Sequence, residues 1–121
     1  MSLTNTGENN LLTLFKGAGP YYLALYTTAP GESGGGTEVS GGGYARQQVT
    51  FGSPSSGSMS NSAAIAFPVA TASWGTVKGW GLVNAATSGD IVWYGTVDVA
   101  KEIAAGDIYR VDAGGMTLTM D

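Results

Sequence analysis

The chain has 121 residues, of which 43% are hydrophobic and only 12% are charged, and its formal net charge is −4. Its five cations, Lys16, Arg46, Lys78, Lys101 and Arg110, are too few and too scattered to form the basic stripe that tracks nucleic-acid phosphates, so we expect no nucleic-acid partner. The chain contains no cysteine and no histidine, which excludes disulfides, zinc sites of the usual cysteine and histidine kinds, and a serine–histidine triad.

The length of the chain suits a single domain over residues 1–121, which would bury roughly two-thirds of the surface of the unfolded chain. No apolar run reaches the roughly 18 residues that a membrane span needs, so we expect no membrane partner. The charged share is about half the usual value for a soluble domain. Either hydroxyl and amide groups keep a β-rich domain soluble, or the flanks of the subunit are covered in an assembly, which is the interpretation we favour.

Residues 4–16 are the strongest candidate for a helix. Its apolar stripe consists of Leu11, Leu12, Leu14 and Phe15. Thr4 or Thr6 can cap the first turn, and Gly17 ends the pattern. One short helix before a strand-rich chain would lie against a sheet edge or one mouth of a sandwich.

From Pro20 onward the hydrophobic period changes to two, which indicates β-strands. Apolar residues occupy both faces of the run from Tyr21 to Tyr26, so we expect protein to cover both faces of this strand. Turn signals separate further strand candidates, at residues 44–51, 56–60, 63–68, 76–84, 91–98, 107–112 and 115–120. The best hairpin candidate is 76–98, with its turn at Ser88-Gly89-Asp90. The pattern predicts an all-β fold, an antiparallel β-sandwich or jelly-roll-like domain with one short N-terminal helix.

Two glycine triplets, Gly34–Gly36 and Gly41–Gly43, follow the first strand candidate. Glycine adopts positive φ without steric cost, so the triplets favour a tight loop over residues 29–43 that docks on another surface. Arg46 comes just after this loop. Its planar guanidinium can hold Glu38, or a carboxylate of a partner, through two parallel hydrogen bonds. The alternative is a surface arginine whose methylenes cover apolar area.

Gly79 and Gly81 flank Trp80 within a strand candidate, where glycine often marks a bulge or the close approach of another backbone. That backbone could come from a neighbouring subunit. The tryptophans can serve the core, a subunit interface or a ligand platform, and strand positions favour the core for Trp80 and Trp93. Trp74, between a serine and a glycine, is the best candidate for a place near the surface.

A pair of carboxylates is the catalytic arrangement that the composition leaves open, because glycoside hydrolysis needs only two acids at a set distance. The candidates are Asp90, Asp98, Asp107 and Asp112. Asp90 lies in a turn signal, and Asp107 follows a glycine at a place where a carboxylate commonly binds nearby backbone amides. We therefore expect no catalytic residue, and the chain carries no recognisable cofactor motif or metal site.

Several short stretches together resemble a known family. They are Leu25 to Gly31, Glu38 to Gly42, Tyr44 to Gln47, Phe67-Pro68, Trp74 to Val77, Ala85-Ala86, Tyr94-Gly95, Ala105 to Asp107 and Gly114 to Thr119. Over almost its whole length the chain resembles a family of small virion proteins of tailed bacteriophages, commonly labelled phage tail fibre proteins. Similar small β-proteins decorate phage capsids as cement proteins.

The resemblance implies a non-enzymatic structural protein of the phage virion, made in the cytoplasm of the bacterial host. We expect a capsid decoration or tail-fibre-associated subunit that acts by protein–protein docking, as a homo-oligomer such as a trimer and with other capsid or tail proteins. The expected interface residues are Gly35, Glu38, Gly42, Tyr44, Arg46 and Trp74. The alternative is a carbohydrate- or host-receptor-binding β-module, in which an exposed Trp74 or tyrosines stack on glycans.

Overall fold

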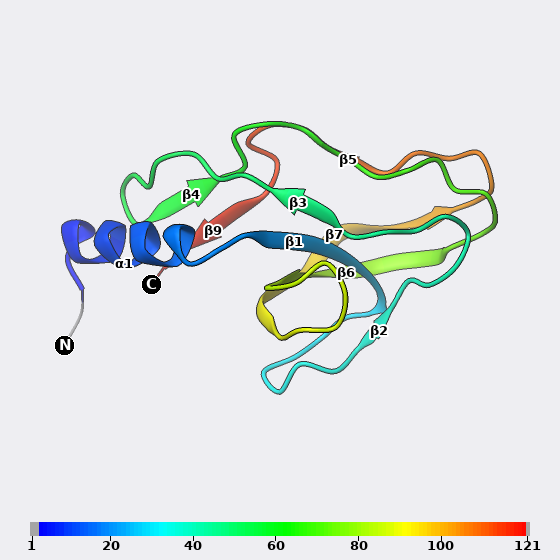
Figure 1. Ribbon diagram of the computed structural model, residues 1–121, viewed down its shortest axis with the longest axis horizontal. Coiled ribbons are helices and arrows are strands. Elements are labelled where there is room, and N and C mark those ends of the chain that lie inside the picture. Colours follow the sequence, from blue (N-terminus) through cyan, green and yellow to red (C-terminus); the bar gives the residue numbers. More distant parts are fainter. Residues whose placement is uncertain (1–2, 121) are drawn as a thin grey trace.

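The computed structural model describes residues 3–120, apart from the side chain of Asp98, and its fold is all-β and antiparallel with one short N-terminal helix (Figure 1). The elements are α1 (Asn5–Gly17), β1 (Tyr21–Thr28), β2 (Thr37–Glu38), β3 (Gln47–Val49), β4 (Ser58–Ser60), β5 (Ile65–Ala66), β6 (Gly75–Val83), β7 (Ile91–Ile103), β8 (Arg110–Val111) and β9 (Thr117–Thr119). Within the described residues, no helix has the length and hydropathy that a membrane crossing requires.

The helix α1 begins where the sequence places its cap. The Oγ1 atom of Thr4 accepts a hydrogen bond of 3.1 Å from the amide of Gly7, which satisfies one of the free amides of the first turn. Lys16 lies in the last turn, where a positive charge complements the helix dipole. The helix ends at Gly17, as its sequence pattern predicts.

Only one half of the apolar stripe of α1 packs on the rest of the protein. Leu12 is 1% exposed, whereas Leu14 is 70% exposed. Phe15 anchors the C-terminal end of the helix, because its ring stacks on that of Tyr21 with 4.3 Å between the centroids. The hydroxyl of Tyr21 in turn donates a hydrogen bond of 2.7 Å to the carbonyl oxygen of Phe15. The helix is thus attached along one side and at its C-terminal end.

The larger sheet has the strand order β2-β1-β6-β7, and β3 also pairs with β1 (Figure 1). The strands β2 and β3 share one edge of β1: β2 lies opposite Tyr26 and Thr28, and β3 lies opposite Tyr21–Leu23. Because β6 occupies the other edge, β1 is central in the sheet. Leu23 and Ala24 point to opposite faces and are 2% and 0% exposed, so both faces of β1 are covered, as its sequence predicts.

The strands β6 and β7 form the hairpin expected over residues 76–98. Between the pairs Val77–Lys101 and Gly79–Thr96, four residues of β7 lie opposite one residue of β6. This irregularity is a bulge, which bends a strand and increases its local twist. It lies on β7, which pairs with β6 alone among the described strands.

The same chain supplies close contacts at Gly79 and Gly81, so these glycines need no neighbouring subunit to explain them. A Cβ atom on Gly79 would lie 2.7 Å from the Cβ of Ala29, and one on Gly81 would lie 2.9 Å from the ring of Tyr26. Both contacts arise because β1 and the residues that follow it lie beside β6.

The second layer consists of two antiparallel pairs of short strands, β4 with β9 and β5 with β8. The main core lies between this layer and the larger sheet, and Leu25, Val77, Ile103 and Leu118 within it are at most 1% exposed. A smaller cluster of Ala24, Tyr26 and Val83 covers the opposite face of the larger sheet. Two long connections of the larger sheet form the site described next.

Candidate functional site

Two connections of the larger sheet come together and are termed here the loop platform: residues 29–46, which link β1 to β3, and residues 84–90, which link β6 to β7. All six glycines of the two triplets adopt positive φ. At Gly36 a Cβ atom would lie only 2.6 Å from the carbonyl oxygen of Thr28, so the chain there needs glycine for space as well as for its backbone angle. The sequence prediction of a tight glycine loop is confirmed.

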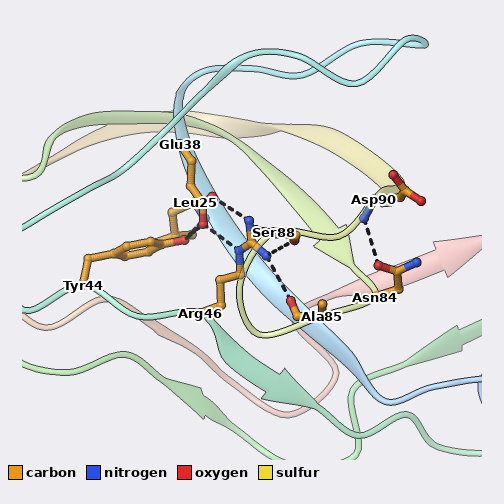
Figure 2. A network of polar contacts seen from close by, with 8 residues as sticks. All are labelled: Leu25, Glu38, Tyr44, Arg46, Asn84, Ala85, Ser88 and Asp90. Carbon is orange, nitrogen blue, oxygen red and sulfur yellow. Dashed lines mark hydrogen bonds and ion pairs between the residues drawn. The ribbon is translucent and has the colours of Figure 1, made fainter.

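A bidentate ion pair lies at the centre of the loop platform (Figure 2). The Nε atom of Arg46 donates to Oε2 of Glu38 at 2.9 Å, and Nη2 donates to Oε1 at 2.8 Å. The hydroxyl of Tyr44 donates to the same carboxylate at 2.6 Å and accepts a hydrogen bond of 3.0 Å from the amide of Leu25. The fork that the sequence suggests for Arg46 is therefore present, and its acid is Glu38 of the same chain.

The remaining donors of Arg46 hold the second connection. Its Nη1 atom donates to the carbonyl oxygens of Ala85, at 3.0 Å, and Ser88, at 2.7 Å (Figure 2). Asn84 closes the same connection, because its Oδ1 atom accepts a hydrogen bond of 2.9 Å from the amide of Asp90. Glu38, Tyr44 and Arg46, with these two carbonyl groups, are termed the Arg46 clamp.

The electrostatics of the Arg46 clamp keep its ion pair charged. Burial alone would raise the pKa of Glu38, but the hydrogen bonds from Arg46 and Tyr44 outweigh it, so the pKa lies below its ordinary value. The hydrogen bond to Glu38 raises the pKa of Arg46 against the effect of burial. Burial, and then the bond to the carboxylate, raise the pKa of Tyr44 far above its ordinary value. The side chains of Arg46 and Glu38 are 12% and 24% exposed.

This arrangement positions backbone, and its pKa shifts do not suit a general acid or base. A general base needs a pKa near the working pH, whereas the carboxylate, phenol and guanidinium here are shifted away from neutrality. The carboxylate also already accepts three hydrogen bonds. The Arg46 clamp therefore holds together three segments of chain that are distant in sequence.

Gly42 and Trp74 form a second contact, below the loop platform. The indole nitrogen of Trp74 donates to the carbonyl oxygen of Gly42 at 2.9 Å, and the amide of Thr71 donates to the same oxygen at 2.9 Å. Trp74 is only 4% exposed and packs edge-on against the rings of Tyr44 and Phe67. The expectation that Trp74 lies near the surface is wrong, because this aromatic cluster and the Gly41–Gly43 turn cover it.

Gly35, the remaining expected interface residue, lies apart from these contacts and is exposed. It directly follows a turn that is closed by reciprocal hydrogen bonds of 2.9 Å between Gly31 and Gly34. It borders a shallow hollow of about 450 Å³ that residues 89–91 complete. A second hollow, of about 510 Å³, lies between residues 38–46 and 86–88.

Sequence reasoning missed the part played by residues 84–90. Ala85 and Ser88 take part through their carbonyl oxygens, which every residue possesses, so the side chains give no signal. The one local signal is Asn84, whose amide side chain can bind the backbone of a turn. Nothing local places this turn beside Arg46, since the bonded residues are 39 and 42 positions apart.

Two of the four acidic residues considered for catalysis, Asp107 and Asp112, have local partners for their carboxylates. The Oδ2 atom of Asp107 accepts a hydrogen bond of 2.9 Å from the amide of Ala104, as expected for an acid after a glycine. Asp112 pairs with the exposed Arg110, and Asp90 belongs to the loop platform. The side chain of Asp98 lies outside the described part of the structure. Among the residues that are described, no three acidic side chains gather as metal ligands would.

Comparison with known proteins finds one family whose model matches the chain. The family model described as Gp80, podophage GP4 fiber I protein gp80, matches residues 2–119 of the chain. The match therefore covers the helix, both layers of the sandwich and the loop platform. No individual curated protein matches the chain.

Proposed function

Because the chain belongs to the family of the podophage GP4 fiber I protein gp80, a structural component of bacteriophage virions, we propose that it acts by docking its loop platform on another virion protein. The family is that of a structural fiber protein, which agrees with the expected non-enzymatic role. The expectation of a phage tail-fibre-type virion family is confirmed.

The observation that carries this proposal is the Arg46 clamp. Ordering a flexible loop on binding costs about 0.5–1.5 kcal/mol for each side chain that becomes immobilised, and that cost is subtracted from the affinity. Here four hydrogen bonds from one guanidinium fix two connections in advance. A glycine-rich loop that would otherwise be mobile can therefore be a rigid docking surface.

The exposed surface around the Arg46 clamp suits contact with protein. Ser40, Gly41, Ala86 and Thr87 border one hollow and carry no charge. Interface cores are depleted of charged residues, and small side chains bring a partner close to the backbone. We assign direct contact to these residues and to Gly35, and a positioning role to Glu38, Tyr44 and Arg46. Gly42 and Trp74 support the platform from below.

An assembly of many copies of the chain would strengthen the binding of each loop platform. We propose that the chain assembles as a homo-oligomer, a trimer in the simplest case, and joins other virion proteins after synthesis in the host cytoplasm. Once one copy is bound, the contacts of its neighbours become intramolecular, so weak individual contacts suffice. The low charged share of 12% agrees with flanks that an assembly covers.

The place of the subunit in the virion has two candidates. The family description names a fiber, which favours a fibre- or tail-associated subunit. The sequence has no internal repeat from which a long shaft could be built, which favours capsid decoration. Electron microscopy of phage particles that carry a gold-labelled copy distinguishes the two: label at the tail supports the first, and label over the head supports the second.

The docking role is tested with Arg46→Lys, which keeps the positive charge but loses the bidentate fork. We expect the variant to fold and its loop platform to become mobile, with a clear drop in incorporation into particles. The matched control is Arg110→Lys, which alters a pair whose side chains are 61% and 86% exposed and should be incorporated normally. Full incorporation of Arg46→Lys, with loop amides that exchange faster with solvent, would contradict the proposal.

The alternative function, a glycan-binding module, loses its named residue. A tryptophan that is 4% exposed and bonded through its indole nitrogen offers no open face for a sugar. Any sugar site in this protein therefore has to use other aromatic residues.

A further inference from the structure

A cleft of about 310 Å³ opens between the larger sheet and the strands β8 and β9, on elements other than the loop platform. Leu23 and Leu25 of β1 form its apolar floor. Trp80 and Tyr109 form two aromatic walls, and Thr96 and Thr117 contribute hydroxyl groups at the rim. No charged side chain is among the described residues that line it.

Trp80 lies flat across the neighbouring strand. It is paired with Gly95 of β7, and a Cβ atom at Gly95 would lie 2.7 Å from the Nε1 and Cε2 atoms of the indole. The absence of a side chain at this position lets the indole rest on the backbone of β7. The indole thereby packs on β7 and also lines the cleft. We take the ring face that β7 leaves uncovered as the surface for stacking.

The polar atoms of these two aromatic residues have no hydrogen-bond partner among the described atoms. Two buried aromatic residues differ in this respect, because the indole of Trp74 is bonded to Gly42 and the hydroxyl of Tyr21 to Phe15. No such bond occurs for the indole nitrogen of Trp80 or the hydroxyl of Tyr109 among the described atoms of residues 3–120, which do not include the side chain of Asp98. In the same part of the chain no buried side-chain nitrogen or oxygen lacks a partner, so both groups face accessible space. Burial raises the pKa of Tyr109, which keeps its hydroxyl protonated at neutral pH.

We propose that this cleft binds one pyranose unit of a neutral saccharide, with the C–H face of the ring stacked on Trp80 and its hydroxyls bonded to Tyr109 and the rim threonines. An ionic ligand would be left without a counter-charge among the described lining residues, which is costly in a partly buried site. The volume lies at the lower end of the range for small-molecule sites, roughly 300–1,000 Å³, and suits one ring rather than a longer segment.

The competing occupant is an apolar side chain from a second copy or another virion protein. Such a side chain would fill the floor, but it would also remove water from the free donors of Trp80 and Tyr109 without replacing the lost hydrogen bonds. A sugar ring can cover the apolar floor with its C–H face and replace the lost hydrogen bonds with its hydroxyl groups. The saccharide site is independent of docking through the loop platform, so either proposal can fail alone.

The test uses the full chain, labelled with ¹⁵N, and follows the indole N–H signals of its three tryptophans by NMR. The probes are the methyl glycosides of glucose, galactose and N-acetylglucosamine at millimolar concentrations, and dextran as a polymer of glucose. We expect at least one probe to shift the Trp80 signal. The Trp74 signal is an internal control, because that N–H group is bonded to Gly42 and should not move.

Four variants sharpen the result. Trp80→Ala should abolish binding, and Tyr109→Phe, which removes only the hydroxyl, should weaken it by about three- to tenfold. Trp93→Phe is the matched control: Trp93 packs edge-on against Phe15 at 5.6 Å, does not line the cleft and should leave binding unchanged. If Trp80→Ala does not fold, Tyr109→Phe and Thr117→Val decide the question.

The outcomes separate the occupants. A Trp80 shift with a methyl glycoside supports a site for a single free unit, and a shift with dextran alone supports the same cleft holding a unit within a chain. The proposal is overturned if no probe shifts the Trp80 signal, or if the shift survives in Tyr109→Phe and Thr117→Val at full affinity. A change in oligomeric mass in Trp80→Ala, without saccharide binding by the wild-type chain, would also overturn it and assign the cleft to a neighbouring subunit.

Discussion

Two arginines of this protein pair with carboxylates, and the two pairs differ in burial and reach. Arg46 and Glu38 meet at 2.8 Å with side chains 12% and 24% exposed, whereas Arg110 and Asp112 meet at 3.2 Å with side chains 61% and 86% exposed. The first pair is bidentate and belongs to a network that extends 42 positions along the chain. The second joins residues two positions apart.

The two ion pairs have similar chemistry but differ in how much each contributes to the stability of the fold. An exposed pair is screened by water and must give up side-chain entropy, so it contributes about 0–1 kcal/mol. A shielded pair costs desolvation, but removal of one partner then leaves a charge that nothing compensates. The Arg46 clamp is therefore expected to be sensitive to every change in its members, and the Arg110 pair insensitive. The following predictions test that contrast.

The largest effect is expected for Arg46→Leu. This change removes two of the three hydrogen bonds to the carboxylate of Glu38 and takes the donor from two backbone carbonyl groups. Removal of one partner of a buried pair costs about 3–5 kcal/mol, and because this pair retains some exposure we expect about 3 kcal/mol. Urea denaturation measures the free energy of unfolding. A loss below about 1 kcal/mol would place Arg46 in the class of surface pairs and break the contrast.

A smaller loss is expected for Tyr44→Phe, which removes the hydroxyl and keeps the ring. The hydroxyl donates to Glu38 and accepts from the amide of Leu25, so two hydrogen bonds disappear. We expect a loss of about 1–2 kcal/mol in the free energy of unfolding, by the same urea measurement. The double variant with Arg46→Leu should lose less than the sum of the two single losses, because both residues act on one carboxylate.

Acidification should weaken the Arg46 clamp more gently. Since the folded state holds the pKa of Glu38 below its ordinary value of 4.5, this carboxylate adds stability that is fully present above that value and is lost as the pH falls through the folded pKa. The thermal midpoint measured from pH 7 down to pH 3 should therefore fall at the acid end. The control is Glu38→Gln, in which this part of the pH dependence should disappear; an unchanged profile would show that other acids cause it.

The smallest effect is expected for Arg110→Leu. Its partner Asp112 is 86% exposed and remains fully hydrated without the arginine. We expect a change within about 0.5 kcal/mol in the free energy of unfolding. A loss as large as that of Arg46→Leu would mean that exposure does not separate the two pairs.

Part of the Arg46 clamp was predictable because its members lie close together in sequence. Glu38 and Arg46 are eight positions apart on either side of a glycine turn, and the planar guanidinium suits a carboxylate. Tyr44 lies between them. Its position was expected at an interface, but its bond to the amide of Leu25, 19 positions away, was not. The carbonyl groups of residues 84–90 were beyond prediction, because backbone acceptors carry no residue-specific signal.

The burial of Trp74 also depends on residues that are distant in sequence, and here the sequence prediction failed. Its neighbours in sequence, Ser73 and Gly75, indicate a surface position. The side chain is nevertheless buried against Tyr44 and Phe67 and covered by Gly42, residues that are 30, 7 and 32 positions away. Local polarity describes the backbone around a residue and does not determine which distant rings enclose its side chain.

The amino-acid sequence by itself determined the helix and most of the strands, because capping, glycine turns and a hydrophobic period of two act over a few residues. It gave no signal for β2, which lies within the predicted loop over residues 29–43, or for the extension of β7 from residue 98 to Ile103. The helix cap at Thr4, the two covered faces of β1 and the hairpin of β6 and β7 all follow from such local patterns. Only the tertiary structure decided that β2 and β3 share one edge of β1, that residues 84–90 reach Arg46, and that Trp80 rests on Gly95. These contacts join segments far apart in the chain, and their geometry depends on how the whole core packs.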